Sequence, residues 1–283
     1  TKVGQGVETT LAQMTADAFG IDIDRVAINP VDTAVAPFNT STTSSRTTFS
    51  VGNAILAAVE DVTEQLREFA AAEWGVSPED VTVEDGRVVG PDGSMSMADA
   101  VMTRFVGGGG TVVGTGYFTT ESAGDEGSYA SAFWMTGATY AEVTVDTRTG
   151  RWRVDRWVNA TDAGRVIDPE RARGQILGAA AQGLGHAKSE EMVFEGGQQV
   201  NKSLLDYKVP VFEDLPDDST AIAVESGDPD GPFGAKGVGE SNTVTVPPAI
   251  GNAIRDATGA RVRRLPMTPE RVLRAIEGEE VAE

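Results

Sequence analysis

One loop of this sequence combines three glycines with a terminal carboxylate: Gly234-Ala-Lys-Gly-Val-Gly-Glu240. Glycines at this spacing let a backbone adopt positive φ and approach a ligand closely. A glutamate at the end of such a loop can be buried, and burial raises a carboxyl pKa towards that of a working base. The pattern is compatible with a general base, but a single glutamate flanked by glycines is more typical of a solvated loop. The rest of the sequence must decide between these interpretations.

Three further segments combine small and polar residues in the way that a large phosphate-bearing ligand requires. They are Gly4-Gln5-Gly6, the Ser/Thr run from Thr40 to Thr48, and Gln182-Gly183-Leu184-Gly185. Each offers backbone N–H groups, hydroxyls or amides, which can surround a phosphate without formal charge. The first two precede predicted helices, where free N–H groups collect. Taken singly, each segment is also typical of an ordinary turn, loop or helix end.

Composition argues against several other chemistries. His186 is the only histidine, and without a Gly-x-Ser-x-Gly elbow we expect it to cap or pack near a helix end. The absence of cysteine excludes disulfides, thiolate metal sites and a cysteine-held iron–sulfur cluster on this chain. A net charge of −20 disfavours nucleic acid and anionic membranes as partners. Because no apolar run has spanning length and no secretory leader is visible, we expect a cytoplasmic protein.

The elements that must position these segments alternate along the chain. Apolar stripes and capping signals predict helices over Val7–Ala18, Val51–Ala72, Ser96–Phe105, Pro169–Ala187, Pro247–Gly259 and from Pro269 onward. Gly20 is expected to end the first of them and Asp168 to cap the fourth, whose many Gly and Ala residues predict an unusually close packing partner. Alternation and turn signals predict a strand at Arg25–Asn29, a hairpin of Tyr140–Asp146 with Trp152–Val158 through a turn at Thr147–Gly150, and a hairpin through Asp85-Gly86. Gly107–Gly110 reads as a flexible connection, since it lacks the ending of a phosphate loop. Hairpins with segregated helices indicate an α+β fold. We expect one region over residues 1–283, which divides at most into two intertwined lobes, about 1–135 and 136–283.

Six segments, taken in the order in which they occur along the chain, resemble the molybdopterin-binding large subunit of the xanthine dehydrogenase and aldehyde oxidase family, the molybdenum hydroxylases. The segments are Gly4–Thr10, Ser44–Thr48, Asp162–Pro169, Gln182–Gly185, Gly234–Glu240 and Leu265–Val272. The resemblance extends over nearly the whole chain, and Gly-Val-Gly-Glu is its most specific motif. It covers only the C-terminal molybdopterin region of that subunit.

The resemblance implies a role for each matching residue. Glu240 corresponds to the catalytic base, which takes a proton from a hydroxyl on molybdenum as that oxygen attacks an electron-poor carbon. Ser44 falls where the family's backbone passes beside the metal, with no direct side-chain ligand. The residues that correspond to cofactor contacts are Gly4, Gln5, Ser44, Ser45, Thr47, Gln182, Lys236 and Gly239.

Cofactors and partners also follow from the resemblance. The chain would hold molybdenum–molybdopterin in its cytosine dinucleotide form, while FAD and 2Fe-2S clusters would lie on partner chains. Because the family's large subunit has a preceding half, we expect a companion chain carrying that half. A 2Fe-2S small subunit and an FAD subunit would complete a dimer of heteromers. The expected substrate is a small molecule: a purine, a nicotinate-like heterocycle, an aldehyde or an aromatic thioester.

Two alternatives stay open. A non-catalytic cofactor-binding or structural subunit of such a complex would lack the base, whereas Glu240 is present. An unrelated binding module for a nucleotide or sugar would share only the glycine-rich loops. Phe233, just before the loop, is either a core aromatic or part of the substrate mouth. Ser241-Asn242 replaces the paired prolines common in eukaryotic members, which favours a prokaryotic branch.

Overall fold

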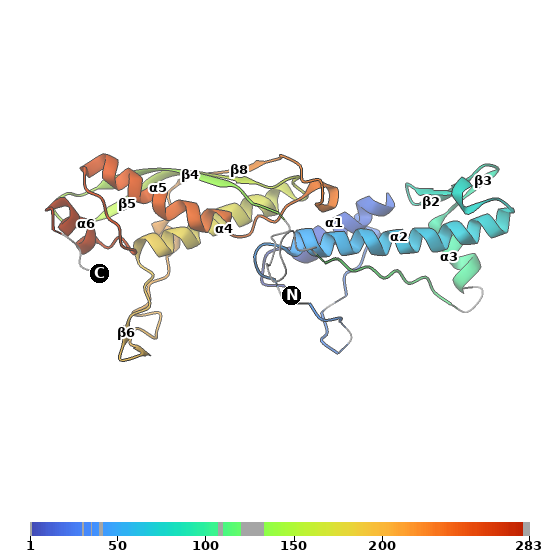
Figure 1. Ribbon diagram of the computed structural model, residues 1–283, viewed down its shortest axis with the longest axis horizontal. Coiled ribbons are helices and arrows are strands. Elements are labelled where there is room, and N and C mark those ends of the chain that lie inside the picture. The colour runs from blue at the N-terminus through green and yellow to red at the C-terminus, as the bar shows by residue number, and fades with distance from the viewer. Residues whose placement is uncertain are drawn as a thin grey trace, which may run out of the picture. The chain divides into compact units, whose positions relative to one another are not determined.

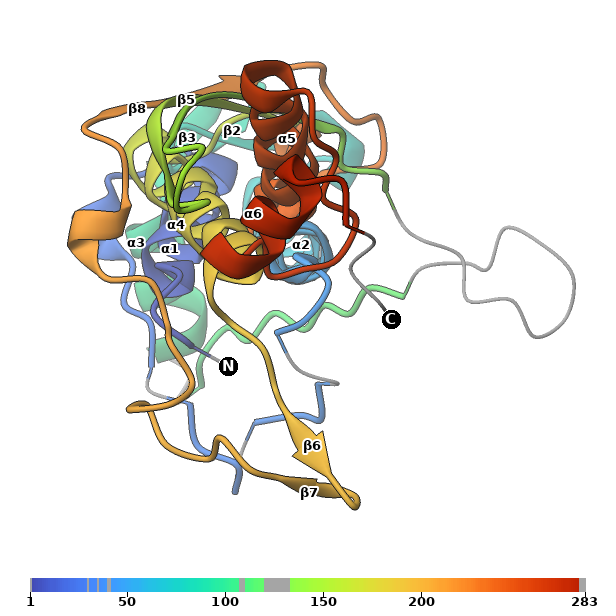
Figure 2. The ribbon, with the colours of Figure 1, turned by 90° about the vertical axis from the view of Figure 1, so that its left-hand side faces the viewer.

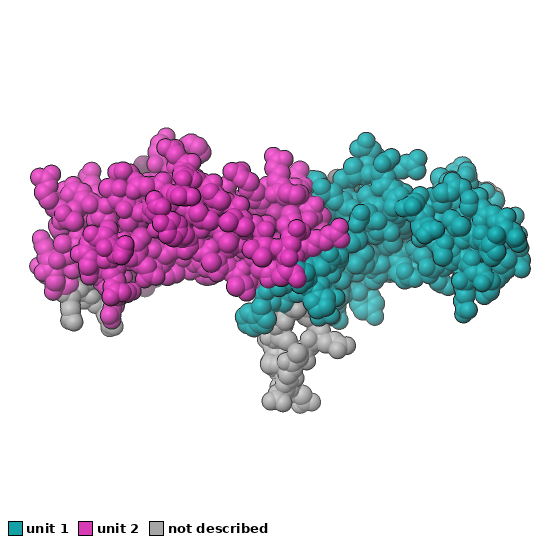
Figure 3. All heavy atoms as spheres, turned by 90° about the horizontal axis from the view of Figure 1, so that it is seen from above, with its two compact units in different colours: residues 1–134, 227–237 teal, residues 135–226, 238–283 magenta. Residues whose placement is uncertain are grey.

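The chain divides into two compact units, coloured separately in Figure 3. Unit 1 comprises residues 1–134 together with 227–237, and unit 2 comprises 135–226 together with 238–283. These units come from a computed structural model, which describes residues 2–29, 31–34, 36–39, 42–106, 110–119 and 133–279. The predicted Gly107–Gly110 connection lies outside the described residues except for Gly110. The glycine-rich loop is divided between the units after Gly237.

Unit 1 is built around the long helix α2, Thr47–Trp74, against which α1, Val7–Phe19, packs (Figure 1). The chain reverses after α1 because Gly20 adopts a left-handed conformation, with φ 63°. The C-terminal half of α2 shares a core with a small sheet and with α3, Met97–Val101. The buried residues of this core are Leu66, Ala70, Ala71, Val81, Val88 and Ala100.

The small sheet of unit 1 is antiparallel and runs in the order β1-β2-β3. Its strands are β1 Thr82–Glu84, β2 Arg87–Gly90 and β3 Gly93–Ser96. The predicted turn at Asp85-Gly86 is confirmed, since both residues have positive φ, 49° and 68°, as a tight hairpin requires. The predicted strand at Arg25–Asn29 is wrong. A 3₁₀ turn, Ile23–Arg25, closes there instead, because the N–H of Val26 donates to the carbonyl of Ile23.

Unit 2 packs two helices against a three-stranded sheet of order β4-β5-β8 (Figure 2). Strand β4, Gly137–Val145, pairs antiparallel with β5, Trp152–Asp162, which pairs in parallel with β8, Asp218–Val224. The predicted hairpin between β4 and β5 is thereby confirmed. A small hairpin, β6 Phe194–Glu195 and β7 Gln198–Gln199, follows the first of the two helices.

The helices of unit 2 are α4, Pro169–Lys188, α5, Ser241–Thr258, and α6, Pro269–Ile276. As predicted, Asp168 caps α4 by accepting from the N–H of Arg171. Both helices α4 and α5 contribute to a core with the sheet, and the indole N–H of Trp152 donates to the carbonyl of Met267 at 2.7 Å. Helices with mixed antiparallel and parallel strands confirm the α+β prediction. None of the helices in the described ranges has the length and apolar character needed to cross a membrane.

The predicted start of α5 at Pro247 is wrong, because the helix begins six residues earlier, at Ser241. Pro247 and Pro248 lie inside it, where proline removes a helical hydrogen bond. Local sequence therefore favours a start at the prolines. Tertiary contacts override that preference, since Ser241 and Asn242 are buried in a polar network described below.

Candidate cofactor and catalytic site

Two segments of unit 1 meet backbone to backbone at the predicted cofactor residues. A Cβ placed on Gly237 would lie 1.5 Å from the carbonyl oxygen of Ser45 and 2.6 Å from its carbonyl carbon. No side chain fits in that space, so Gly237 must be glycine for the two segments to touch. The glycine-rich loop and the Ser/Thr run, far apart in sequence, therefore form one surface.

The backbone of this surface is strained. Ser44, Ser45 and Phe233 adopt positive φ, at 54°, 53° and 55°. Left-handed conformations of non-glycine residues cost on the order of 1–3 kcal/mol each and gather at functional sites. The only other such residue in the described part of the chain is Asp85, whose hairpin turn explains it.

Ser45 also presents an unsatisfied polar group. Its Oγ is buried and has no hydrogen-bond partner within the described residues. A buried hydroxyl left unpaired costs about 1–3 kcal/mol, so native structures retain few of them. A bound molecule that offers a hydrogen-bond partner would remove that cost. The orphaned hydroxyl and the close approach at Gly237 fit the cofactor contact that is expected at Ser45.

Three helices begin at predicted site segments, and all three lack a side-chain cap. They are α1, whose N-cap is Gly6, α2, whose N-cap is Arg46, and α5, whose N-cap is Glu240. By contrast, side chains cap α3, α4 and α6. The first N–H groups of a helix have no intrahelical partner and attract anions. The uncapped helices therefore present donors where the sequence predicts cofactor contacts, at Gly4, Gln5 and Thr47.

Lys236 is held inside unit 1. Its ammonium donates to the carbonyl of Trp134 at 3.2 Å and lies 3.9 Å from a carboxylate oxygen of Asp228. The backbone N–H of Asp228 donates in turn to the carbonyl of Gly234. Because its side chain is only 12% exposed and makes these contacts within unit 1, Lys236 helps to hold the glycine-rich loop in place. Its contact with a cofactor stays a prediction.

Gly239 and Glu240 belong to unit 2, at the start of α5. The carboxylate of Glu240 is exposed, and it makes no hydrogen bond or ion pair with the described residues. Of the two interpretations of the loop, the exposure of Glu240 agrees with a solvated carboxylate in this chain taken by itself, because no described side chain covers it. The side chain is free to meet a ligand or a partner chain.

A buried polar network fixes the backbone immediately after Glu240. The hydroxyls of Thr161 and Ser241 lie 2.6 Å apart. The amide of Asn242 donates to the carbonyl of Ala160 at 3.4 Å and to the hydroxyl of Thr245 at 3.2 Å. Asn242 is completely buried, so these bonds attach the first turn of α5 to β5. The sequence analysis did not assign this role to Ser241 and Asn242, although two small polar residues directly after Glu240 were the available signal.

Removing the amide at the centre of this network should destabilise unit 2. We expect Asn242→Ala to cost about 2–3 kcal/mol, because several buried polar groups lose their partner. The midpoint of thermal unfolding should fall by roughly 5–10 °C. Asn252→Ala is the matched control, since Asn252 is exposed on the same helix, and it should change stability by less than about 0.5 kcal/mol. Equal melting temperatures for the two variants would contradict the role given to the network.

Gln182 lies on α4, where its carbonyl oxygen accepts from the hydroxyl of Thr243 at 3.1 Å. The next residue, Gly183, touches α5 so closely that a Cβ would lie 2.8 Å from the Cβ of Val246. The predicted close packing of this helix is thus confirmed. His186 is exposed in the last turn of α4, which confirms its predicted place near a helix end.

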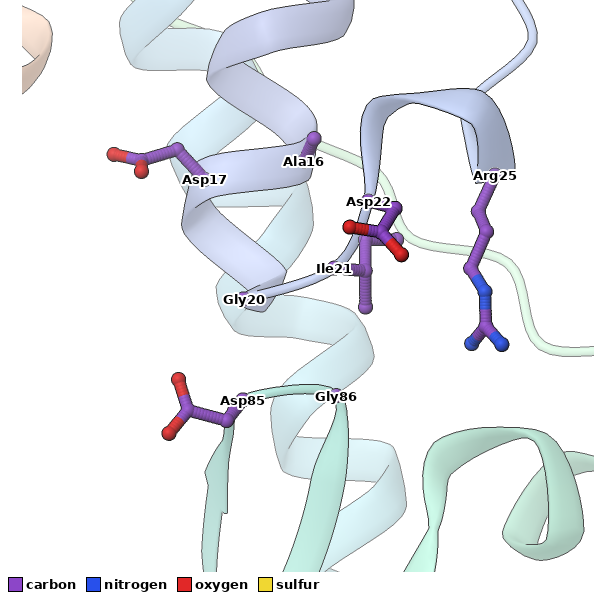
Figure 4. Close-up of a pocket in the computed structure, with 8 residues that line it drawn as sticks. All are labelled: Ala16, Asp17, Gly20, Ile21, Asp22, Arg25, Asp85 and Gly86. Atoms are coloured by element: carbon purple, nitrogen blue, oxygen red, sulfur yellow. The ribbon is translucent and has the colours of Figure 1, made fainter.

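A separate hollow of about 500 Å³ lies at the other end of α1 in unit 1 (Figure 4). Its charged lining comes from Asp17, Asp22, Arg25 and Asp85. None of the predicted site residues contributes to it, so it is distinct from the candidate site.

Comparison with known proteins identifies the family of this chain. A family model described as a molybdopterin cofactor-binding domain matches residues 1–216. The gamma subunit of the 6-hydroxypseudooxynicotine dehydrogenase complex of Paenarthrobacter nicotinovorans is 35% identical over 99% of this chain and 36% of its own length. A probable hypoxanthine oxidase of Escherichia coli K12 is 34% identical over 97% of this chain and 28% of its own.

Solved structures extend the comparison to the fold. The crystal structure of quinoline 2-oxidoreductase from Pseudomonas putida 86 superposes with a TM-score of 0.83 and 29% identity, covering 99% of this chain and 36% of that one. This chain thus spans about a third of the length of the relatives it matches. It belongs to the molybdopterin cofactor-binding domain family, within the xanthine dehydrogenase and aldehyde oxidase group of molybdenum hydroxylases.

Proposed function

We propose that this chain is the C-terminal molybdopterin-binding part of the catalytic subunit of a molybdenum hydroxylase. The enzyme would hydroxylate an electron-poor carbon of an N-heterocycle or aldehyde, with water as the source of oxygen. The observation that best supports this proposal is the contact of Gly237 with Ser45 beside a buried, unpartnered hydroxyl. Such a surface suits a large polar cofactor held by neutral donors.

Unit 1 would bind the cofactor through hydroxyls and backbone N–H groups. Ser45 would donate or accept through its Oγ, and the backbone of Ser44 would pass beside the metal. Gly4, Gln5 and Thr47 would place the open first turns of α1 and α2 against phosphate groups, whose negative charge they stabilise. When bound, molybdenum–molybdopterin supplies the redox chemistry of the reaction.

Unit 2 would supply the proton acceptor. Glu240 is positioned as the N-cap of α5 by the network around Asn242, and its carboxylate has no competing partner among the described residues. A carboxylate so placed can accept the proton that is released when water oxygen is added to the substrate carbon. Gly239 would contact the cofactor through its backbone. On α4, Gln182 would contribute an amide donor, since its oxygen is engaged with Thr243.

The remaining parts of the enzyme would lie on other polypeptides. We propose that the rest of the molybdopterin subunit, the part of the matched relatives outside the aligned third, completes the site from a companion chain. FAD and 2Fe-2S clusters would be carried by further subunits, and this chain, which has no cysteine, holds none of the clusters. The cytosine dinucleotide form of the cofactor, cytoplasmic assembly and a dimer of heteromers complete the proposal. Residues 1–283 as a whole would form one molybdopterin-binding region.

The dependence on a companion chain gives a direct test. Expressed alone, this chain should bind little molybdenum, whereas an assembly purified from the native host through a tag on it should contain molybdenum, FAD and iron together. Metal analysis and mass spectrometry of the bound subunits measure both expectations. Stoichiometric molybdopterin on the isolated chain would contradict the need for a companion, and an assembly without molybdenum would contradict the function.

A further inference from the structure

Residues 111–119 of unit 1 have the character of a β-strand without a sheet. The segment is rich in β-branched and aromatic residues, TVVGTGYFT. Its exposure alternates, with Thr111, Val113, Thr115 and Tyr117 exposed and the residues between them half-buried. This period of two is that of a strand, and Figure 2 shows its pleated path in light green. None of the sheets in the described ranges includes it.

The inner face of this segment lies directly on the backbone of α2. A Cβ on Gly114 would be 2.4 Å from the carbonyl oxygen of Ala58, and one on Gly116 would be 2.1 Å from that of Ala54. Two glycines at alternate positions therefore let an extended chain run alongside the helix, as Figure 1 shows. This contact fixes which face of the segment points outward.

One edge of the segment is held by side chains of α2. The N–H of Thr115 donates to a carboxylate oxygen of Asp61 at 2.8 Å, and the amide of Gln65 donates to the carbonyl of Val113 at 2.9 Å. The Thr115 N–H, followed by the Gln65 amide, lowers the pKa of Asp61 from its ordinary value. In an extended chain the N–H and C=O of one residue share an edge, and successive residues alternate. Asp61 and Gln65 thus hydrogen-bond to the edge formed by the N–H and C=O groups of the odd-numbered residues.

The opposite edge has no partner. Among the described residues, the N–H and C=O groups of Val112, Gly114, Gly116 and Phe118 accept or donate no hydrogen bond. A row of open backbone groups on a flat strand is a template for pairing with another strand. The side chains of Val113 and Tyr117 beside it are 64% and 84% exposed. The segment therefore offers a partner both backbone hydrogen bonds and apolar surface.

We propose that residues 111–119 pair, through the even-numbered edge, with a β-strand of the companion polypeptide that carries the rest of the molybdopterin subunit. This inference rests on the proposed function. The gamma subunit of the 6-hydroxypseudooxynicotine dehydrogenase complex aligns with 99% of this chain and has nearly two thirds of its own length outside the alignment, a region that can supply such a strand. A second copy of this chain is a poor occupant, because each copy carries a net charge of −20 and like charges repel.

Hydrogen exchange of the backbone amides tests this pairing residue by residue. In the isolated chain, the amides of Val112, Gly114, Gly116 and Phe118 should exchange rapidly, while that of Thr115 is protected. In the assembly purified through a tag on this chain, the four even-numbered amides should exchange at least about tenfold more slowly. Rapid exchange in the assembly would overturn the proposal. Slow exchange of the four even-numbered amides in the isolated chain would also overturn the proposal. If that protection increased with protein concentration, a second copy of the chain would be the occupant, and otherwise the chain itself would cover the edge.

A pair of proline variants gives a second readout. Val112→Pro removes an N–H from the open edge, whereas Thr111→Pro, the matched control, removes one from the edge that faces Asp61. We expect Val112→Pro to weaken retention of the companion chain roughly tenfold and Thr111→Pro to leave it nearly unchanged. Equal retention would count against the pairing. Molybdenum in the wild-type assembly reports separately on the proposed function, since an assembly with protected even-numbered amides and no molybdenum would contradict only that function.

Discussion

Replacing Glu240 with glutamine should abolish turnover and leave the molybdenum content of the assembly near that of the wild type. Glutamine keeps the size and polarity of the side chain but cannot accept a proton at neutral pH. Loss of a general base typically lowers a rate by about 10²–10⁴-fold. Because the carboxylate forms no hydrogen bond or ion pair with the described residues, its removal breaks no structural contact. The measurement is kcat per molybdenum, so that cofactor loss is not mistaken for slow chemistry.

Glu195→Gln provides the control for this variant. Glu195 is an exposed glutamate in the β6 strand of the same unit, and it belongs to none of the proposed site segments. Its replacement should change kcat per molybdenum by less than about twofold, as expected for a surface substitution. Wild-type turnover by Glu240→Gln would sink the assignment of the base. It would then favour the alternative of a non-catalytic cofactor-binding subunit.

Gly237→Ala should have the second large effect, on cofactor content instead of chemistry. The added methyl would lie 1.5 Å from the carbonyl oxygen of Ser45, so the loop and the serine segment must separate. Overpacking of this kind typically costs about 1–3 kcal/mol, here at the surface proposed to hold the cofactor. We expect molybdenum content to fall at least about tenfold, since 1.4 kcal/mol already corresponds to a tenfold change in binding.

The matched control is Gly93→Ala, also in unit 1. A Cβ on Gly93 meets nothing nearer than 3.9 Å, from the indole of Trp74, so the substitution fits the existing space. Molybdenum content should then match that of the wild type. Full cofactor occupancy in Gly237→Ala, with normal thermal unfolding, would show that the contact with Ser45 is dispensable for binding.

The sequence predicted those turns and helix ends that are determined by two or three neighbouring residues. Asp85-Gly86 specifies a hairpin, Asp168-Pro169 a helix start, and Gly20 a helix end, and each is confirmed. The predicted start of α5 is wrong because Pro247 is a local signal for a helix start, whereas the helix in fact begins at Ser241, where Asn242 contacts distant strands. No local pattern encodes such contacts.

Some features of the candidate site could likewise be predicted from local sequence and others could not. The residue types of the glycine-rich loop and the Ser/Thr run pointed to a cofactor surface, and the structure brings Gly237 and Ser45 together. The left-handed conformations of Ser45 and Phe233 could not be predicted, because neither residue favours them and only surrounding structure enforces them. The sequence left both burial and solvation of Glu240 open, since burial depends on groups outside the loop itself.

The measurement that tests the central claim most directly is the molybdenum content of three assemblies purified through a tag on this chain. They would carry the wild-type sequence, Glu240→Gln and Gly237→Ala. The account predicts equimolar molybdenum with the wild-type chain and with Glu240→Gln, of which only the wild type turns over, and marked loss with Gly237→Ala. An absence of molybdenum from the wild-type assembly, or the same content in all three, would contradict it.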